Sequence, residues 1–215
     1  MTTTPTHPSP LRGGGSGRGG LTARATGHLA SQSSTILLAL LLLASCAPLL
    51  SGDALSREIQ RDPARGVYVP GVPFFPQEPE RCGPAALAMV MAFRGRPVPP
   101  DLIASEIYLP KLKGTLTVDL LTYPRTLGFQ SRIHQGGFPS LIRELRQGNP
   151  VIVLLDIGLP LRTSWHYAVV VGYDTGTESV IAHSGRRENM VFPRELFKKE
   201  WRASGDWGLV VTRRD

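Results

Sequence analysis

The spacing of apolar residues predicts that helices dominate the part of the chain from residue 84 to residue 147. Residues 84–94 are apolar on every face of a helix, which is typical of a buried helix. Pro84 suits its first turn and Gly95 its end. The other predicted helices are 101–108 with Asp101 as N-cap, one capped by Thr115 or Thr117 and kinked or ended by Pro124, and 139–147 stopped by Gly148.

After residue 150 the pattern changes to short runs rich in valine and isoleucine, which predict strands. Residues 67–75 are also β-prone, but the prolines in that stretch favour an edge strand or an extended segment. Helices that come first and strands that cluster later favour an α+β domain over alternating βαβ units. The predicted strands are 151–155, 167–173, 180–182 and 209–212, with a further helix near 194–201.

The N-terminal part of the chain has the pattern of an export signal. Residues 2–34 are rich in Thr, Ser, Gly and Pro, a composition too polar to bury a core, so we expect disorder there. The apolar run 36–43 is shorter than the roughly 20 residues that span a membrane, and small residues follow it. We therefore expect residues 1–45 to be a signal peptide with a disordered n-region.

The end of this signal resembles the lipobox of bacterial lipoproteins, in the residues Leu43-Ala44-Ser45-Cys46. The resemblance implies that Cys46 is lipidated, becomes the first residue of the mature protein and anchors it to a membrane. Ala47 after the cysteine resembles the pattern sorted to the outer membrane of Gram-negative bacteria, which implies a protein facing the periplasm. We expect residues 46–66 to form the lipidated end and a polar tether, and residues 67–215 to form the domain.

The formal net charge of +7 does not indicate nucleic acid binding. Residues 1–45 contain arginines and no acidic residue, so part of the charge lies in the predicted signal. The other basic residues occur as scattered doublets that are typical of a solvated surface. We expect no nucleic-acid partner.

Cys82 is the candidate nucleophile of the domain. It stands directly before the predicted helix 84–94, and the N-terminus of a helix lowers the pKa of a thiol through the backbone dipole. The backbone N–H groups there also suit a developing oxyanion, and Gln77, on a loop five residues earlier, would supply a second donor. The alternative is a buried structural cysteine.

His166 is the candidate base. It opens the apolar run 167–173, which predicts a buried strand, and a histidine at the mouth of such a strand is rigidly placed for a thiol–imidazole pair. The alternative is a histidine without a partner.

Together these segments resemble the bacteriocin-processing, double-glycine leader peptidases, a family of papain-like cysteine peptidases. The resemblance rests on Gln77, then Cys82-Gly83-Pro84-Ala85, then Trp165-His166-Tyr167 and Gly172-Tyr173-Asp174, and covers roughly residues 70–212. It implies a papain-like fold, with an N-terminal helical lobe packed on an antiparallel sheet. It also implies Cys82 as nucleophile, His166 as general base and Gln77 in the oxyanion hole.

The sequence departs from that family at the third catalytic position. The family has an Asp on the strand after the histidine strand, where this chain has Ser184. A hydroxyl there would accept the imidazole N–H but stabilise an imidazolium less than a carboxylate does. Asp174 and Asn189 are the other candidates for this role.

The sequence thus predicts a cysteine peptidase that cleaves a peptide or protein substrate through an acyl-enzyme and is anchored in the cell envelope. One alternative is a weak or inactive papain-like module that binds peptides during export. Another is transfer of the acyl group to an amine. No cofactor is expected, and a metal site of Cys82, His166 and His183 is disfavoured because these residues include no closely spaced pair.

Overall fold

A computed structural model of the chain describes residues 51–78 and 80–213. The predicted signal peptide and the predicted lipidation site at Cys46 lie outside these residues. No helix among the described residues combines the length and apolar character needed to cross a bilayer.

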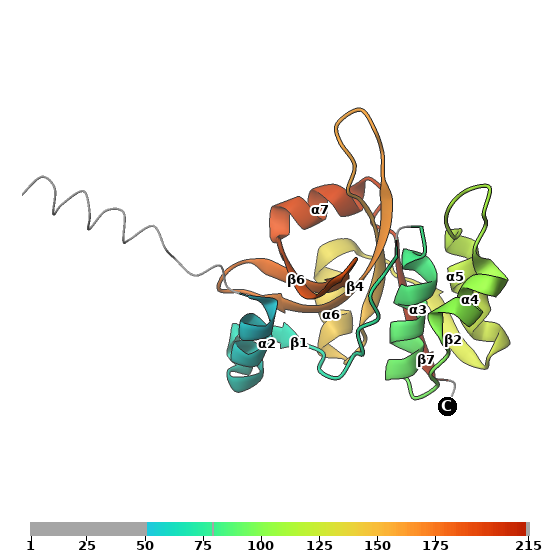
Figure 1. Ribbon diagram of the computed structural model, residues 1–215. Helices are drawn as coiled ribbons and strands as arrows, with labels where there is room; N and C mark the ends of the chain where they lie inside the picture. Colours follow the sequence, from blue (N-terminus) through green and yellow to red (C-terminus); the bar gives the residue numbers. More distant parts are fainter. Residues whose placement is uncertain (1–50, 79, 214–215) are drawn as a thin grey trace, which may run out of the picture. The chain divides into compact units, whose positions relative to one another are not determined.

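The described chain builds a seven-stranded antiparallel sheet with helices on both sides (Figure 1). Strand order is β2-β7-β3-β4-β5-β6, and β1 pairs with the C-terminal half of β4. The strands are β1 Gly66–Tyr68, β2 Phe129–Ile133, β3 Val151–Asp156, β4 Trp165–Asp174, β5 Ser179–Ser184, β6 Arg187–Pro193 and β7 Gly208–Arg213. The helices are α2 Gly52–Arg61, α3 Cys82–Phe93, α4 Pro100–Ile107, α5 Thr117–Thr126, α6 Gly137–Arg146 and α7 Arg194–Arg202, with a 3-10 turn at Pro63–Arg65.

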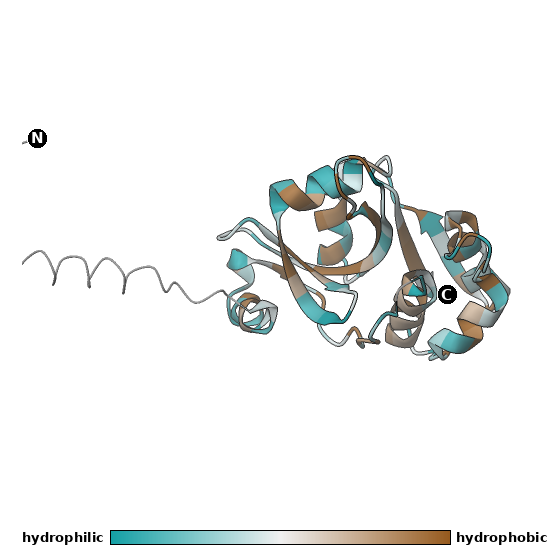
Figure 2. Ribbon diagram, turned by 45° about the horizontal axis from the view of Figure 1, so that its top comes forward, coloured by the Kyte–Doolittle hydropathy of each residue, from teal (hydrophilic) through white to brown (hydrophobic). Residues whose placement is uncertain are grey.

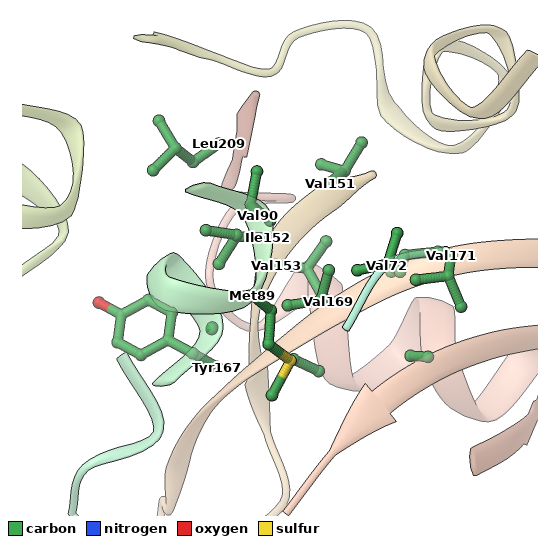
Figure 3. Close-up of a cluster of buried hydrophobic side chains, with 14 of the residues drawn as sticks. Val72, Met89, Val90, Val151, Ile152, Val153, Tyr167, Val169, Val171 and Leu209 are labelled. Carbon is green, nitrogen blue, oxygen red and sulfur yellow. The ribbon is translucent and has the colours of Figure 1, made fainter. Parts of the chain in front are cut away.

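The centre of the molecule is the contact between α3 and the strands β3, β4 and β7. Met89 and Val90 of the helix lie against Val153, Val169 and Leu209 of the sheet (Figure 3). All five side chains are buried, as an all-apolar helix requires. The start of α3 is therefore held rigidly against β4.

The remaining helices are amphipathic and cover the outside. Helices α4 and α5 lie beside α3, whereas α6 and α7 pack on the other part of the sheet (Figure 1). These helices carry both hydrophilic and hydrophobic residues, and the central strands are largely hydrophobic (Figure 2). The α+β prediction, with a helical part packed on an antiparallel sheet, is confirmed.

The prediction of a polar tether is wrong for residues 52–66. Ser51 caps α2, accepting a hydrogen bond from the N–H of Ala54 at 3.2 Å, and Leu55 and Ile59 of this helix are buried. Strand β1 then pairs with β4 from Gly66 onward. Leu55 and Ile59 are spaced at i and i+4 and therefore lie on one face of α2, which contacts β1, β4 and β6.

Smaller corrections concern helix ends and edge strands. Pro99, not Asp101, is the N-cap of α4, and Leu116 is the N-cap of α5. Pro124 lies inside α5 near its end and does not end it. The sequence also predicted neither β2 nor β6, the two outermost strands.

Candidate active site

Cys82 is the first residue of helix α3. Arg81 precedes it as N-cap without a capping side-chain hydrogen bond, and Gly83-Pro84 completes the first turn. The first N–H groups of a helix have no intrahelical partner, so those around Cys82 are available to other acceptors. The sulfur is partly buried and not in a disulfide.

An open edge of β4 faces this sulfur. Pairing of β5 with β4 reaches only as far as Val169, so the backbone of Tyr167 has no strand on that side. Its N–H donates to the Sγ of Cys82 at 3.5 Å, and its carbonyl accepts from the Nε2 of Gln77 at 3.3 Å. The residue next to His166 is therefore in direct contact with Cys82.

Gln77 folds back onto the same place. The side-chain Oε1 of Gln77 accepts from the backbone N–H of Gly185 at 2.7 Å. The backbone N–H of Gln77 donates to the carbonyl of Gly185 at 2.8 Å. These two bonds fix the carboxamide so that Nε2 points toward Cys82, whose carbonyl accepts from it at 3.4 Å. Gln77 is almost fully buried.

His166 stands on β4 with its Nε2 at 3.0 Å from the Oγ of Ser184 on β5. The Nδ1 atom makes no hydrogen bond to any described residue. Burial lowers the pKa of the imidazole, which favours its neutral form. Cys82, His166 and Gln77 all line one cavity of about 480 Å³.

No hydrogen bond joins the thiol of Cys82 to the imidazole of His166 within the part of the chain that the structure describes. Burial raises the pKa of Cys82, and this effect outweighs the N–H groups of Tyr167 and Gly83, which lower it. The N–H groups at the helix start thus lower the pKa of this thiol as expected, but burial has the larger effect and the net pKa is raised. Both shifts favour the uncharged forms, a thiol at Cys82 and a neutral imidazole at His166.

The family of the chain follows from its sequence. The sequence model of the Peptidase_C39 like family matches residues 69–208. This chain belongs to the Peptidase_C39 like family.

Solved structures agree with this assignment. A C39-like peptidase from Bacillus anthracis aligns with 70% of this chain and 98% of its own, at 20% identity and a TM-score of 0.60. The peptidase domain of ComA from Streptococcus, a bi-functional ABC transporter, aligns with 67% of this chain and 100% of its own, at 22% identity and a TM-score of 0.55. Comparison with curated protein sequences gives no match.

A third structure contains a peptide. It is a double glycine motif protease from an AMS/PCAT transporter in complex with the leader peptide, and it aligns with 69% of this chain and 99% of its own. Its identity is 19% and its TM-score 0.53. At these identities the likeness concerns the fold, and the papain-like fold predicted from the sequence is confirmed.

In this C39-like protein the other two candidates for the third catalytic position, Asp174 and Asn189, make hydrogen bonds to residues other than His166. Asp174 is fully buried at the far end of β4 and accepts from the Nε of Arg65 at 2.6 Å. The side chain of Asn189 bonds Tyr68 and Asp53. Among the described residues only Ser184 is hydrogen-bonded to the imidazole of His166.

His183 is also occupied by structural contacts. Its Nε2 lies 3.1 Å from the carbonyl of Val72, and its Nδ1 accepts from the N–H of Asn189 at 3.2 Å. It is therefore not free to join Cys82 and His166. No group of three or more metal-ligating side chains comes together among the described residues.

Two groups of the site had no signal in the sequence. The N–H of Tyr167 and the backbone of Gly185 act through main-chain atoms that every sequence supplies. Their placement depends on where β5 stops pairing with β4, which is a property of the assembled sheet.

Proposed function

We propose that this chain is a cysteine peptidase that cleaves a peptide bond through an acyl-enzyme on Cys82. The observation that carries the proposal is the convergence of Cys82, Gln77 and His166 on one cavity at the start of α3. Membership of the Peptidase_C39 like family and the peptide-bound structural relative support a peptide substrate.

The chemistry begins from a neutral pair. With Nε2 protonated and donating to Ser184, the Nδ1 of His166 is basic and takes the proton from the thiol of Cys82 as its sulfur attacks the carbonyl carbon. The developing oxyanion is stabilised by the backbone N–H of Cys82 and the Nε2 of Gln77. The two hydrogen bonds that Nε2 of Gln77 makes in the resting protein are long. Replacing them by a hydrogen bond to the oxyanion therefore costs little free energy.

Collapse of the tetrahedral intermediate breaks the C–N bond. The leaving amine takes the proton from His166, and the acyl group stays on the sulfur as a thioester. Water then attacks the thioester with His166 again as base, which releases the acid and restores the thiol. Ser184 holds the ring by its hydrogen bond, but as a neutral group it stabilises the imidazolium less than a carboxylate does.

The test is cleavage of a peptide library by the purified protein, with products sequenced by mass spectrometry. We expect Cys82→Ser and His166→Ala to lower turnover by at least about 10³-fold, as loss of a nucleophile or base does. An intact-mass adduct on Cys82 that forms with an activated peptide ester would report the acyl-enzyme directly. Turnover that persists in Cys82→Ser would contradict the proposal.

A second candidate is a peptide-binding module with little or no turnover. Two observations favour it, namely the hydroxyl in place of a carboxylate beside His166 and the raised pKa of Cys82. It predicts that peptides bind with similar affinity to the original protein and to Cys82→Ser, and that neither protein cleaves them.

We propose in addition that the protein is a lipoprotein anchored through Cys46 at the outer membrane and facing the periplasm. The support is the lipobox-like sequence ending in Cys46. Metabolic labelling with an alkyne fatty acid tests it, because Cys46→Ser should abolish the label while Cys82→Ser retains it. Label in Cys46→Ser, or none in either variant, would exclude lipidation at this position.

A further inference from the structure

A second cavity opens beside Cys82, and His166 is not among the residues that line it. Its volume is about 410 Å³, within the range of about 300–1,000 Å³ that binds small ligands. We call it the leucine cavity, and we call the cavity that contains His166 the histidine cavity. The apolar residues of the leucine cavity are Leu112, Leu116, Leu154, Trp165 and Tyr167.

The alternation of side chains along β4 assigns Tyr167 to the leucine cavity and His166 to the histidine cavity, and Trp165 lines both. Successive residues of a strand point to opposite faces, so Trp165 and Tyr167 lie on one face and His166 on the other. Leu154 is paired with Tyr167 across β3 and β4, and cross-strand partners share a face. The strand thus places an apolar surface and a base on either side of the same sulfur.

Apolar side chains of the leucine cavity remain exposed to water. The exposed fractions are 62% for Leu112, 44% for Leu116 and 51% for Trp165. They come from the α4–α5 connection and from the start of β4, which lie far apart in the sequence. Apolar residues gathered from separate segments around a reactive group are typical of a binding surface.

The charged residues of the leucine cavity compensate each other. The Nζ of Lys113 lies 3.4 Å from the Oε1 of Glu80, and the hydroxyl of Tyr108 donates to the same carboxylate. Glu80 and Lys113 are the charged residues that line the leucine cavity. The cavity therefore offers a charged ligand no unpaired opposite charge, and an uncharged side chain fits it best.

The direction of the substrate follows from the chemistry. The leaving amine must take a proton from His166, so the amine half of the substrate lies in the histidine cavity. The acyl half then lies in the leucine cavity, which adjoins the histidine cavity and shares Cys82, Glu80, Lys113 and Trp165 with it.

We propose that the leucine cavity is a specificity subsite for the acyl half of the substrate. It selects peptides with a bulky, uncharged apolar side chain at one of the two residues that precede the scissile bond. This inference rests on the proposed peptidase function and adds the substrate class. Glycine has no side chain, so a subsite specific for glycine would not require a cavity of about 410 Å³.

The test uses a set of peptides based on one sequence that the protein cleaves in the peptide library. The peptides carry Gly, Leu, Phe or Asp at each of the two positions that precede the scissile bond. At one of them we expect kcat/KM for Leu or Phe to exceed that for Gly and for Asp by at least about 10-fold, since apolar pockets discriminate by such factors. The informative variant is Leu116→Asp. Leu116 is the N-cap of α5, where Asp is a favoured residue, so the helix tolerates the change.

In Leu116→Asp we expect the ratio of kcat/KM for the Leu peptide to that for the Gly peptide to fall toward one. The matched control is Leu196→Asp, because Leu196 is 45% exposed on α7 and does not line the leucine cavity. If the Gly peptide is cleaved and Leu or Phe at neither position raises kcat/KM, the proposed subsite is wrong, whereas the proposed peptidase function is supported. Absence of cleavage of every peptide would overturn both.

Discussion

At the scale of single residues, the proposed role of His166 as a base depends on its hydrogen-bond partner, Ser184. Its Oγ lies 3.0 Å from the Nε2 of His166 and is the partner that orients the ring. A neutral hydrogen bond of this kind contributes about 0.5–1.5 kcal/mol, whereas a carboxylate adds a charge that opposes the imidazolium formed during proton transfer.

Different substitutions of Ser184 should therefore change kcat in opposite directions. We expect Ser184→Ala to lower kcat by about 2- to 10-fold, the equivalent of one neutral hydrogen bond. We expect Ser184→Asp to raise kcat and to move the acid limb of the pH–rate profile to higher pH, because a carboxylate raises the pKa of the imidazole.

The matched control for both changes is Ser179→Ala. Ser179 is on the same strand and, like Ser184, is 7% exposed, but it hydrogen-bonds to the carbonyl of Thr177. An equal loss of kcat in Ser179→Ala and Ser184→Ala would show that Ser184 acts through general stability.

Burial of Cys82 gives a second prediction at this scale. Because burial raises its pKa above the ordinary value, the thiolate fraction at neutral pH is smaller than that of a free cysteine. Alkylation by iodoacetamide, followed from pH 6 to 10 in a Cys46→Ser background, should therefore reach half its maximal rate above the midpoint of the same protein unfolded in urea. A midpoint lower in the folded protein would indicate a thiolate–imidazolium pair instead.

The sequence predicts the side chains of this site better than its electrostatics. Gln77, Cys82 and His166 were predicted from the motifs beside a helix and a strand, and Ser184 from the resemblance to the family. The fold brings all four together. Their catalytic roles stay predictions. The sequence indicated that the helix start lowers the thiol pKa but not that burial outweighs this effect, because burial of the sulfur is a property of the tertiary structure.

At the scale of elements, α2 shows how a weak pattern becomes a stable helix. Its sequence is largely polar, and the helix is held to the domain by the buried residues Leu55, Ser56 and Ile59. It contacts β1, β4 and β6. The backbone leaves little space there, because a Cβ added at Gly52 would lie 1.6 Å from the carbonyl oxygen of Asn189.

If α2 is part of the folded domain, truncating its buried side chain Leu55 must lower the free energy of unfolding. We expect Leu55→Ala to lower the free energy of unfolding by about 2–5 kcal/mol, the usual cost of removing a buried leucine side chain. Arg57→Ala on the exposed face of the same helix should change it by less than about 0.5 kcal/mol. Urea denaturation measures both, and equal stabilities would restore the tether interpretation.

Edge strands were missed for a related reason. Strand β2 has the sequence FQSRI and alternates buried and exposed residues, but it is short and pairs with β7, which follows it by many residues. Strand β6 contains charged residues and ends in Pro193. Central strands such as β3 and β4 were predicted because they are buried on both faces and are therefore continuously apolar.

At the scale of the whole molecule, burial of several histidines couples folding to pH. Burial lowers the pKa of His134, His166 and His183 below the ordinary value of 6.5. As pH falls below about 6.5, the unfolded chain binds protons that the folded chain does not, so stability decreases. Each such histidine contributes a slope of at most about 1.4 kcal/mol per pH unit.

His183 is the position at which this coupling is best tested, since the catalytic proposal does not use it. It is 1% exposed and bonds the carbonyl of Val72 and the N–H of Asn189. A glutamine offers one acceptor and one donor group and does not titrate, so His183→Gln keeps the polar pairing possible.

We expect the free energy of unfolding to fall between pH 6.5 and pH 5 in the original protein, and to fall less steeply in His183→Gln. The difference between the two slopes isolates His183 from Glu200, whose raised pKa acts in the opposite direction. Urea denaturation at half-unit pH steps gives both slopes. Identical slopes would mean that His183 binds its proton equally well in the folded and unfolded chains, and hence that burial does not govern its pKa.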